Sequence, residues 1–98
     1  MDAEPTVRHD DERQRYEVLL DGEVVGFADH HPLGDGVEVF PHTVVDPAHE
    51  GKGLAGVLVR HALDDVRARG VRVVPSCWYV ARWIDRNPAY RDLLADRA

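Results

Sequence analysis

The sequence predicts a single α/β domain with a mixed sheet, in which antiparallel strands come first and a strand-helix-strand crossover follows. Three observations support this fold class. Residues 15–30 alternate apolar and polar side chains around the turn dipeptide Asp21-Gly22, which is typical of a β-hairpin. Residues 53–69 place apolar side chains at helical spacing. Residues 71–75, VRVVP, form a short β-branched segment directly after that helix.

The first half of the chain predicts three antiparallel strands. The two strands of the hairpin are followed by HPLGDG, residues 31–36, which has the composition of a turn. Residues 37–45, VEVFPHTVV, then predict the third strand. Pro41 has no amide hydrogen to donate to a ladder, so we expect a bulge or a sheet edge at this position.

The second half predicts the crossover and C-terminal helices. We expect a helix from Gly53 to Arg69, which Gly70 ends. A right-handed connection would place residues 71–75 parallel to the HTVV segment, residues 42–45. Residues 78–87 predict a second helix that ends before Pro88, and we expect fraying after Leu94. The expected domain spans residues 1–98, with an ordered core at about 14–94.

Composition restricts the classes of partner. The chain has 98 residues and a formal net charge of −6, from 18 acidic and 12 basic residues, which argues against nucleic acid as the main ligand. The acidic N-terminus lacks the pattern of a signal peptide and no segment has membrane-spanning length, so we expect a cytoplasmic protein that has no membrane partner. A single cysteine, Cys77, excludes an internal disulfide.

Geometry predicts the position of a ligand site. In a parallel crossover, the end of the first strand, the start of the helix and the end of the second strand meet at one edge of the sheet. Here that edge carries the glycines 51, 53 and 56, beside Lys52, at the positive end of the helix dipole, which favours an anionic, phosphate-bearing ligand. Pro75 allows the parallel strands to part, and the backbone of Val44 and Val45 would then be free to pair with an extended amide arm such as pantetheine.

The same glycines spell G-x-G-x-x-G, the dinucleotide-binding fingerprint, but the context differs from that fingerprint. Five residues, 46–50, separate the strand from Gly51, and the second strand ends in Pro75, Ser76 and Cys77 instead of an acidic residue. A dinucleotide-binding fragment is therefore a weaker alternative, third after the two functions given at the end of this section. A Walker loop is excluded because no Ser or Thr follows Lys52.

The segment EGKGLA, residues 50–55, resembles the [QR]-x-x-G-x-[GA] pyrophosphate loop of the GCN5-related N-acetyltransferase (GNAT) superfamily, with Glu50 in the place of Gln or Arg. Residues 42–80, followed by NPAY, resemble the small branch that includes YjdJ-like proteins and animal N-acetyltransferase domain-containing protein 1. The similarity runs from about Tyr16 to Leu94. It implies a minimal GNAT-like fold with C-terminal helices, and acetyl-CoA in a cleft between splayed strands.

The resemblance also implies roles for individual residues. Cys77 and His42 are the catalytic candidates of this branch, and His42 would activate Cys77 or accept a proton from the amine. The residue types alone, apart from the resemblance, make Tyr79 a further candidate proton donor to the departing thiolate. Arg82 and Arg86 lie one turn apart, and they either meet the 3′-phosphate of coenzyme A or form a solvated helix face, which is the interpretation we favour. The residues expected to contact pantetheine or the pyrophosphate are Val44, Val45, Glu50, Gly51, Lys52, Gly53, Leu54, Ala55 and Gly56.

Some candidate residues have simpler interpretations. Trp78 and Trp83 lie at helical spacing, which is more typical of core residues than of a pocket. His30 and His31 are adjacent in a strand and point to opposite faces, so we expect no metal site.

The function predicted from these observations is an acetyl-CoA-dependent N-acetyltransferase. The alternative is a non-catalytic acyl-CoA-binding module or sensor. The sequence identifies neither the amine acceptor, whether small molecule or protein, nor the oligomeric state.

Overall fold

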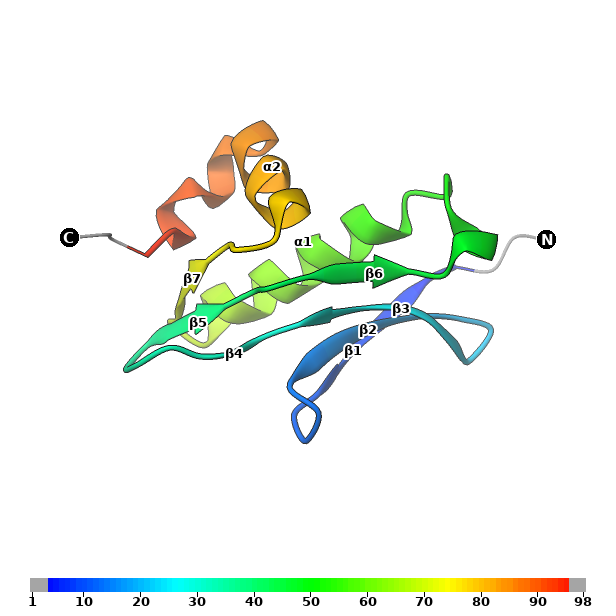
Figure 1. Cartoon of the computed structure of the whole chain (residues 1–98), viewed down its shortest axis with the longest axis horizontal. Helices are drawn as coiled ribbons and strands as arrows, with labels where there is room; N and C mark the ends of the chain where they lie inside the picture. Colours follow the sequence, from blue (N-terminus) through cyan, green and yellow to red (C-terminus); the bar gives the residue numbers. More distant parts are fainter. Residues whose placement is uncertain (1–3, 96–98) are drawn as a thin grey trace.

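A computed structural model describes residues 4–95 and places β-strands against two helices (Figure 1). The strands form two sheets, a four-stranded one in the order β1-β2-β3-β6 and a three-stranded one in the order β4-β5-β7. Their bounds are β1 Thr6–Asp10, β2 Arg15–Leu20, β3 Glu23–Asp29, β4 His31–Pro32, β5 Val37–Val39, β6 Thr43–Val45 and β7 Arg72–Val74. The α-helices are α1 Leu54–Ala68 and α2 Trp78–Arg86, and the 3-10 helices are η1 Pro47–His49 and η2 Pro88–Leu93.

The predicted hairpin is confirmed as β2 and β3. Asp21 and Gly22 both have positive φ angles, 50° and 78°, as a two-residue hairpin turn of the favoured hand requires. An additional strand, β1, pairs antiparallel with β2 and was not predicted, because TVRHD lacks a run of apolar residues. The segment predicted as a turn after β3 also contains the two-residue strand β4, paired with β5.

The segment predicted as one third strand is two strands, β5 and β6, separated at Pro41. The strand parallel to β7 is β5 and not the HTVV segment, so that part of the predicted crossover is wrong. After β5, the Phe40 amide donates to the Val74 carbonyl and the Cys77 amide donates to the Phe40 carbonyl. Beyond Pro41 the chain pairs with β3 instead. The strands therefore separate where proline interrupts the ladder, as the splayed cleft requires.

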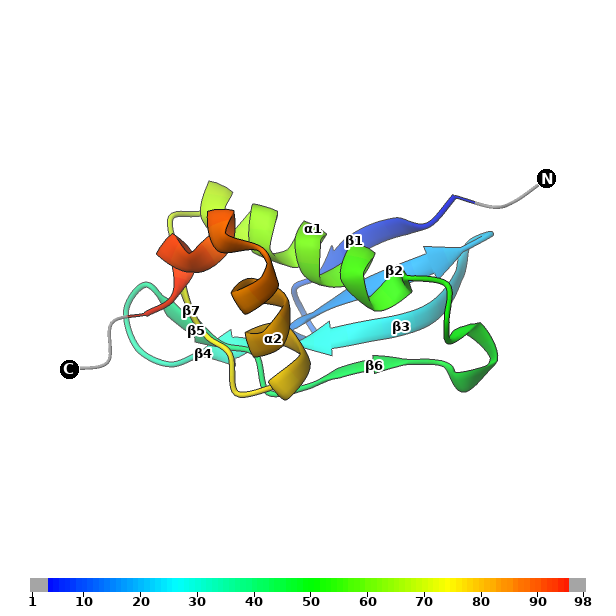
Figure 2. The same cartoon turned by 90° about the horizontal axis from the view of Figure 1, so that it is seen from above.

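The long helix α1 has the predicted position. Gly53 is its N-cap, and Gly70, with a φ of 71°, follows its end. The helix lies across the four-stranded sheet and contacts each of its strands (Figure 2). Its buried stripe forms the centre of the core together with Tyr16, Val18 and Phe40. The buried residues of this helix are Leu54, Leu58, Val59, Ala62, Leu63 and Val66.

The second predicted helix is confirmed as α2, which ends before Pro88. Val80 and Ile84 are its buried residues, and Leu93 of η2 packs into the same core. The predicted fraying after Leu94 falls mainly on residues 96–98, which lie outside the described part of the chain. None of the described helices is both long and apolar enough to cross a bilayer.

Candidate functional site

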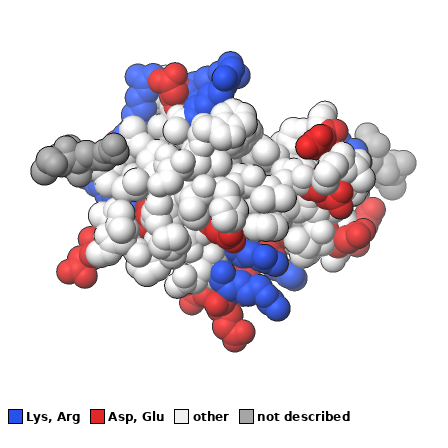
Figure 3. Space-filling model, in the orientation of Figure 1, with Lys and Arg blue, Asp and Glu red and all other residues white. Residues whose placement is uncertain are grey.

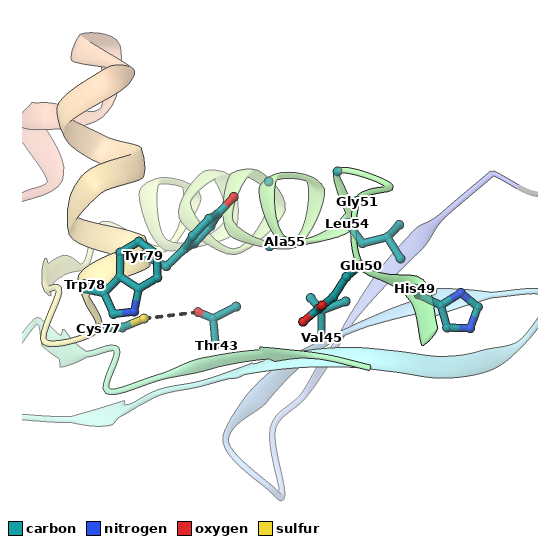
Figure 4. Close-up of a pocket in the computed structure, with 12 residues that line it drawn as sticks. Thr43, Val45, His49, Glu50, Gly51, Leu54, Ala55, Cys77, Trp78 and Tyr79 are labelled. Atoms are coloured by element: carbon teal, nitrogen blue, oxygen red, sulfur yellow. Dashed lines mark hydrogen bonds between the residues drawn. The ribbon is translucent and has the colours of Figure 1, made fainter. Parts of the chain in front are cut away.

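A cavity of about 350 Å³ lies between β6, the start of α1 and the start of α2. Figure 4 shows Cys77, Trp78 and Tyr79 at one end of this cavity and Glu50 and His49 at the other, with β6 along its floor. It joins residues 43–56 to residues 77–79, and 20 residues of the sequence separate these two segments. Its lining residues are Thr43, Val45, His49, Glu50, Gly51, Gly53, Leu54, Ala55, Gly56, Cys77, Trp78 and Tyr79.

One edge of β6 is open toward this cavity. On the other edge, the Asp46 amide donates to the Val25 carbonyl at 2.8 Å and the Asp29 amide donates to the His42 carbonyl at 3.1 Å. Backbone groups alternate in direction along an antiparallel strand, so those of Thr43 and Val45 point away from β3. Val45 therefore has the free backbone edge expected of it. The backbone groups of Val44 face β3, and its side chain is 43% exposed on the opposite face of the sheet.

The loop before α1 leaves amide groups available for an anion. Gly51 and Gly53 have φ angles of 85° and 73°, a conformation that favours glycine, and open space lies where a Cβ would stand at either residue. Gly53 caps α1 without a side-chain hydrogen bond, so no side chain occupies the amides of the first turn. Lys52 is exposed beside this loop, with its Nζ 3.1 Å from His49 Nδ1, and lies outside the cavity lining.

Gly56, in the first turn of α1, faces side chains of α2 at ordinary contact distance. A Cβ at this position would lie 3.7 Å from the Tyr79 hydroxyl and 3.8 Å from Trp83 Nε1. The start of α2 therefore closes one side of the cavity.

Cys77 lies at the end of the cavity where β5 and β7 finish. It is the N-cap residue of α2 and is 7% exposed. Its Sγ is 3.8 Å from Thr43 Oγ1 on β6 (Figure 4). Burial raises the pKa of the nearby Tyr79, so this hydroxyl keeps its proton at neutral pH. A thiol and a protonated phenol thus line the same space.

His42 does not lie beside Cys77. It precedes Thr43, and adjacent residues of a strand point to opposite faces. Its Nε2 lies 2.5 Å from Asp29 Oδ2, and its ring packs edge-on against Phe27. His42 is therefore not placed to activate Cys77 directly.

Four lining residues lie outside the predicted catalytic and coenzyme-binding set, namely Thr43, His49, Trp78 and Tyr79. Thr43 lies within an apolar segment that gives no sign of a site, and Tyr79 was predicted only as a proton donor. Trp78 was expected in the core, but it is 73% exposed, so that expectation is wrong for this residue. Its place in the first turn of α2, directly after the strand-end cysteine, was the available indication of a position at the cavity mouth.

Glu50 is the one acidic or basic side chain among the residues that line the cavity, apart from His49. The Glu50 carboxylate points into it (Figure 4), and a negative charge there opposes an anionic ligand. Within residues 4–95, no group of three or more His, Cys, Asp or Glu side chains is arranged to hold a metal ion. The available anion-binding groups on this side are therefore backbone amides at the start of α1.

Comparisons with known proteins give a consistent result. The family model described as GCN5-related N-acetyl-transferase matches residues 15–93. Protein NATD1 of Mus musculus is 31% identical over 85 residues, which cover 84% of this chain and 76% of that protein.

Two solved structures are also similar. A GCN5-like protein from Staphylococcus aureus has a TM-score of 0.72 at 12% identity, covering 95% of this chain and 90% of that one. A GNAT family acetyltransferase from Brucella melitensis, solved in complex with acetyl-CoA, has a TM-score of 0.58 at 26% identity, covering 70% of this chain and 50% of that one. The extent of the family match and the fold agree: the chain belongs to the GCN5-related N-acetyltransferase family.

Proposed function

We propose that this protein transfers an acyl group, with acetyl the first candidate, from a coenzyme A thioester to an amine. The family and the fold support acyl transfer to an amine in general. The observation that carries the finer proposal is one cavity that holds both the open edge of β6 and the uncapped start of α1. Coenzyme A is a ligand that needs both features, because it combines an amide-containing arm with a pyrophosphate.

The chain's own residues fit such a donor in most respects. The backbone of Thr43 and Val45 would pair with the amides of the arm, as an added strand does. The amides after Gly53 would hold the pyrophosphate at the positive end of the helix dipole. Glu50 is the one lining residue that opposes this ligand by its charge.

When bound, the thioester supplies an activated carbonyl. Cys77 is placed to act on it in one of two ways. In the first, Cys77 Sγ bonds to the carbonyl carbon, the bond from that carbon to the coenzyme A sulfur breaks, and the departing sulfur takes the proton that the Cys77 thiol gives up. The neutral amine then attacks the carbonyl carbon of the acyl-cysteine, the bond from that carbon to Cys77 Sγ breaks, and the proton lost by the amine restores the Cys77 thiol. In the second, the neutral amine attacks the thioester carbon directly, the bond from that carbon to the coenzyme A sulfur breaks, Tyr79 or Cys77 gives the departing sulfur its proton, and the proton lost by the amine restores that donor.

Ligand binding tests the donor. A ligand at about 100 times its dissociation constant stabilises the folded state by about 2.7 kcal/mol. For a 98-residue chain this raises the melting temperature by roughly 10–20 °C. We expect this shift with acetyl-CoA and none with NAD, and no shift with any coenzyme A thioester would overturn the proposal.

Mass spectrometry separates the two routes. Incubation with acetyl-CoA would add one acetyl group to the wild-type chain and to the control Ser76→Ala, but not to Cys77→Ala. If transfer is direct, the mass of the wild-type chain stays unchanged after incubation. The Cys77→Ala variant, which still carries Tyr79 as a proton donor, then retains activity toward amines. Binding without transfer to any amine in a panel of small amines and proteins would support the non-catalytic acyl-CoA-binding module.

A further inference from the structure

Two histidines that play no part in the cavity lie in direct contact with each other. His30 follows β3 and is 4% exposed, and its Nε2 lies 2.8 Å from Nε2 of His9 on β1. The His9 ring also stacks on Tyr16, with the ring centroids 4.3 Å apart and 13° between the planes. A hydrogen bond between two imidazoles needs one nitrogen that donates and one that accepts. The contact of this His9–His30 pair therefore depends on how many protons the pair carries.

Glu38 on β5 determines which nitrogen donates in the neutral pair. Its Oε1 lies 2.6 Å from Nδ1 of His30, and neither buried atom has a hydrogen bond to any other group in the described part of the chain. Arg69 donates to the other oxygen, Oε2, at 3.1 Å, which suits a carboxylate. Two lone pairs at 2.6 Å would repel each other, so the proton of a neutral His30 lies on Nδ1. Nε2 of His30 is then the acceptor, and His9 Nε2 donates to it.

The His9–His30 pair can take up one further proton without losing this contact. Nδ1 of His9 lies 3.9 Å from Asp65 Oδ2 on α1, so a proton there faces a carboxylate. A second further proton has only Nε2 of His30 to bind, where it removes the last accepting nitrogen. Two cationic rings would then meet at the position of the hydrogen bond, and their burial makes this repulsion strong.

The surroundings of the pair oppose that second proton. Burial lowers the pKa of His30; the charge of Glu38 acts against this shift, and the charges of His9 and Arg69 add to it. An ordinary histidine titrates near 6.5 and ordinary carboxyl groups near 4, so the histidines are the groups that change charge as the pH falls through 6. The titratable and charged groups that face the pair are Tyr16 of β2, Glu38 of β5, and Asp65 and Arg69 of α1.

The exposed charges near β1 do not compete with the pair in this pH range. Figure 3 shows acidic and basic groups together at the lower edge of the molecule, where the turn between β1 and β2 lies. Beside this turn, Arg13 Nη1 lies 2.8 Å from Asp10 Oδ2, and this contact lowers the pKa of Asp10 below its usual value. This ion pair therefore stays charged at the pH values where histidines take up protons.

The His9–His30 pair attaches β1 to the core. β1 is an edge strand of five residues, and it pairs only with β2. Side chains alternate along it, so Val7 and His9 share the face of their partners Val18 and Tyr16, which belong to the core, and the other three side chains point to the opposite face. Without the contact of His9, Val7 would be the one side chain of β1 that packs on the core.

We propose that the His9–His30 pair is a proton-sensitive latch, which holds β1 on the sheet at neutral pH and releases it when both rings carry a positive charge. Release exposes the edge of β2. The latch is separate from the proposed acyl-transfer site, because Asp65 lies nine residues, about 14 Å along α1, from Gly56, the last residue of α1 that lines the cavity. The proposal therefore does not depend on the proposed function.

The test is hydrogen exchange of the full chain, read by mass spectrometry at pH 7.5 and pH 5.0. The measured quantity is the protection of residues 6–10 divided by that of residues 58–66 in α1, a ratio in which the intrinsic pH dependence of exchange cancels. Uptake of one proton favours release by at most about tenfold for each pH unit below about 6.5. We therefore expect the ratio to fall by about fivefold to thirtyfold in the wild type.

His9→Gln is the matched variant. Its side-chain amide can turn over, so that its nitrogen donates to a neutral His30 and its oxygen accepts from a protonated one. The contact then survives in both states, and the ratio should change by less than about twofold. His61→Gln, which replaces an exposed histidine of α1, should behave as the wild type does.

Three results would overturn the latch. One is a wild-type ratio that stays constant, either because both segments remain protected or because both lose protection together in global unfolding. Another is an equal fall of the ratio in the wild type and in His9→Gln. The third comes from the wild type alone, which keeps the test valid if the variant does not fold. Proton NMR should show the two imidazoles titrating in separate steps, with the amide signals of β1 changing in the second step, and β1 signals that change in the first step or in neither contradict the latch.

Discussion

Replacing Gly26 with alanine tests how the open strand β6 is held against the sheet. Gly26 lies in β3 opposite Val45, and a Cβ there would lie 2.8 Å from the Val44 carbonyl oxygen. It would also lie 3.1 Å from Val18 Cγ1 and 3.2 Å from Val45 Cγ2. Ordinary contacts begin at 3.4 Å, so the β6 backbone must move by about 0.6 Å. A displacement of this size strains the bonds that join β6 to β3.

The expected loss of stability follows from two contributions. Overpacking costs about 1–3 kcal/mol, and weakening the flanking Asp46–Val25 hydrogen bond adds about 1 kcal/mol. For 98 residues, this total of about 2–4 kcal/mol lowers the melting temperature by at least about 8 °C. Affinity for acetyl-CoA should fall too, because Val45 lines the cavity.

Gly56→Ala is the matched control for this substitution. Its added Cβ would meet only ordinary contacts of 3.7 and 3.8 Å, and alanine favours the helix by about 0.5–1 kcal/mol. We therefore expect its melting temperature to rise by a few degrees in calorimetry or circular dichroism. A Gly26→Ala chain that melts within about 2 °C of the wild type would refute the steric argument.

Three further predictions follow from charges and hydrogen bonds. Glu50→Gln removes a negative charge from the cavity and should tighten coenzyme A binding by roughly threefold to tenfold in calorimetry; weaker binding would contradict this. Tyr16→Phe removes hydrogen bonds from the hydroxyl to Asp65 at 2.6 Å and from Arg69 at 2.9 Å, and should cost about 1–3 kcal/mol in urea denaturation; no change would count against it. Burial lowers the pKa of His30 below its usual 6.5, so stability should fall as the pH drops below about 6.5, where the unfolded chain binds the proton more readily. Burial raises the pKa of Asp65, but the Tyr16 hydroxyl and Arg69 together outweigh this and lower it. The folded state should therefore lose stability a second time below about pH 4. Urea midpoints that stay constant both below about pH 6.5 and below about pH 4 would contradict both assignments.

Local signals predicted most of the elements. Asp21-Gly22 marked the hairpin, the apolar spacing of residues 53–69 marked α1, and Gly53 and Gly70 marked its ends. Each signal depends on residues that are neighbours in the sequence. The family match is consistent with that assignment over residues 15–93.

The parallel partner of β7 could not be predicted in the same way. The segments before and after Pro41 in VEVFPHTVV both have the composition of a strand, so either one could pair with a parallel neighbour. Which half does so depends on contacts with β3 and α1, which are distant in sequence. The site shows the same limit, because alternation along β6 separates His42 from Cys77 only once the register with β3 is known.

The break at Pro41 also bears on how an open strand edge is tolerated. A free edge invites pairing with another chain and hence aggregation. Here β6 has three residues and lies between Pro41 and Pro47, neither of which has an amide hydrogen to extend a ladder. A second protein strand therefore gains few hydrogen bonds from this edge, whereas a short arm with two amides needs only the groups of Thr43 and Val45. The prolines that limit strand pairing thus leave an edge matched in length to a small ligand.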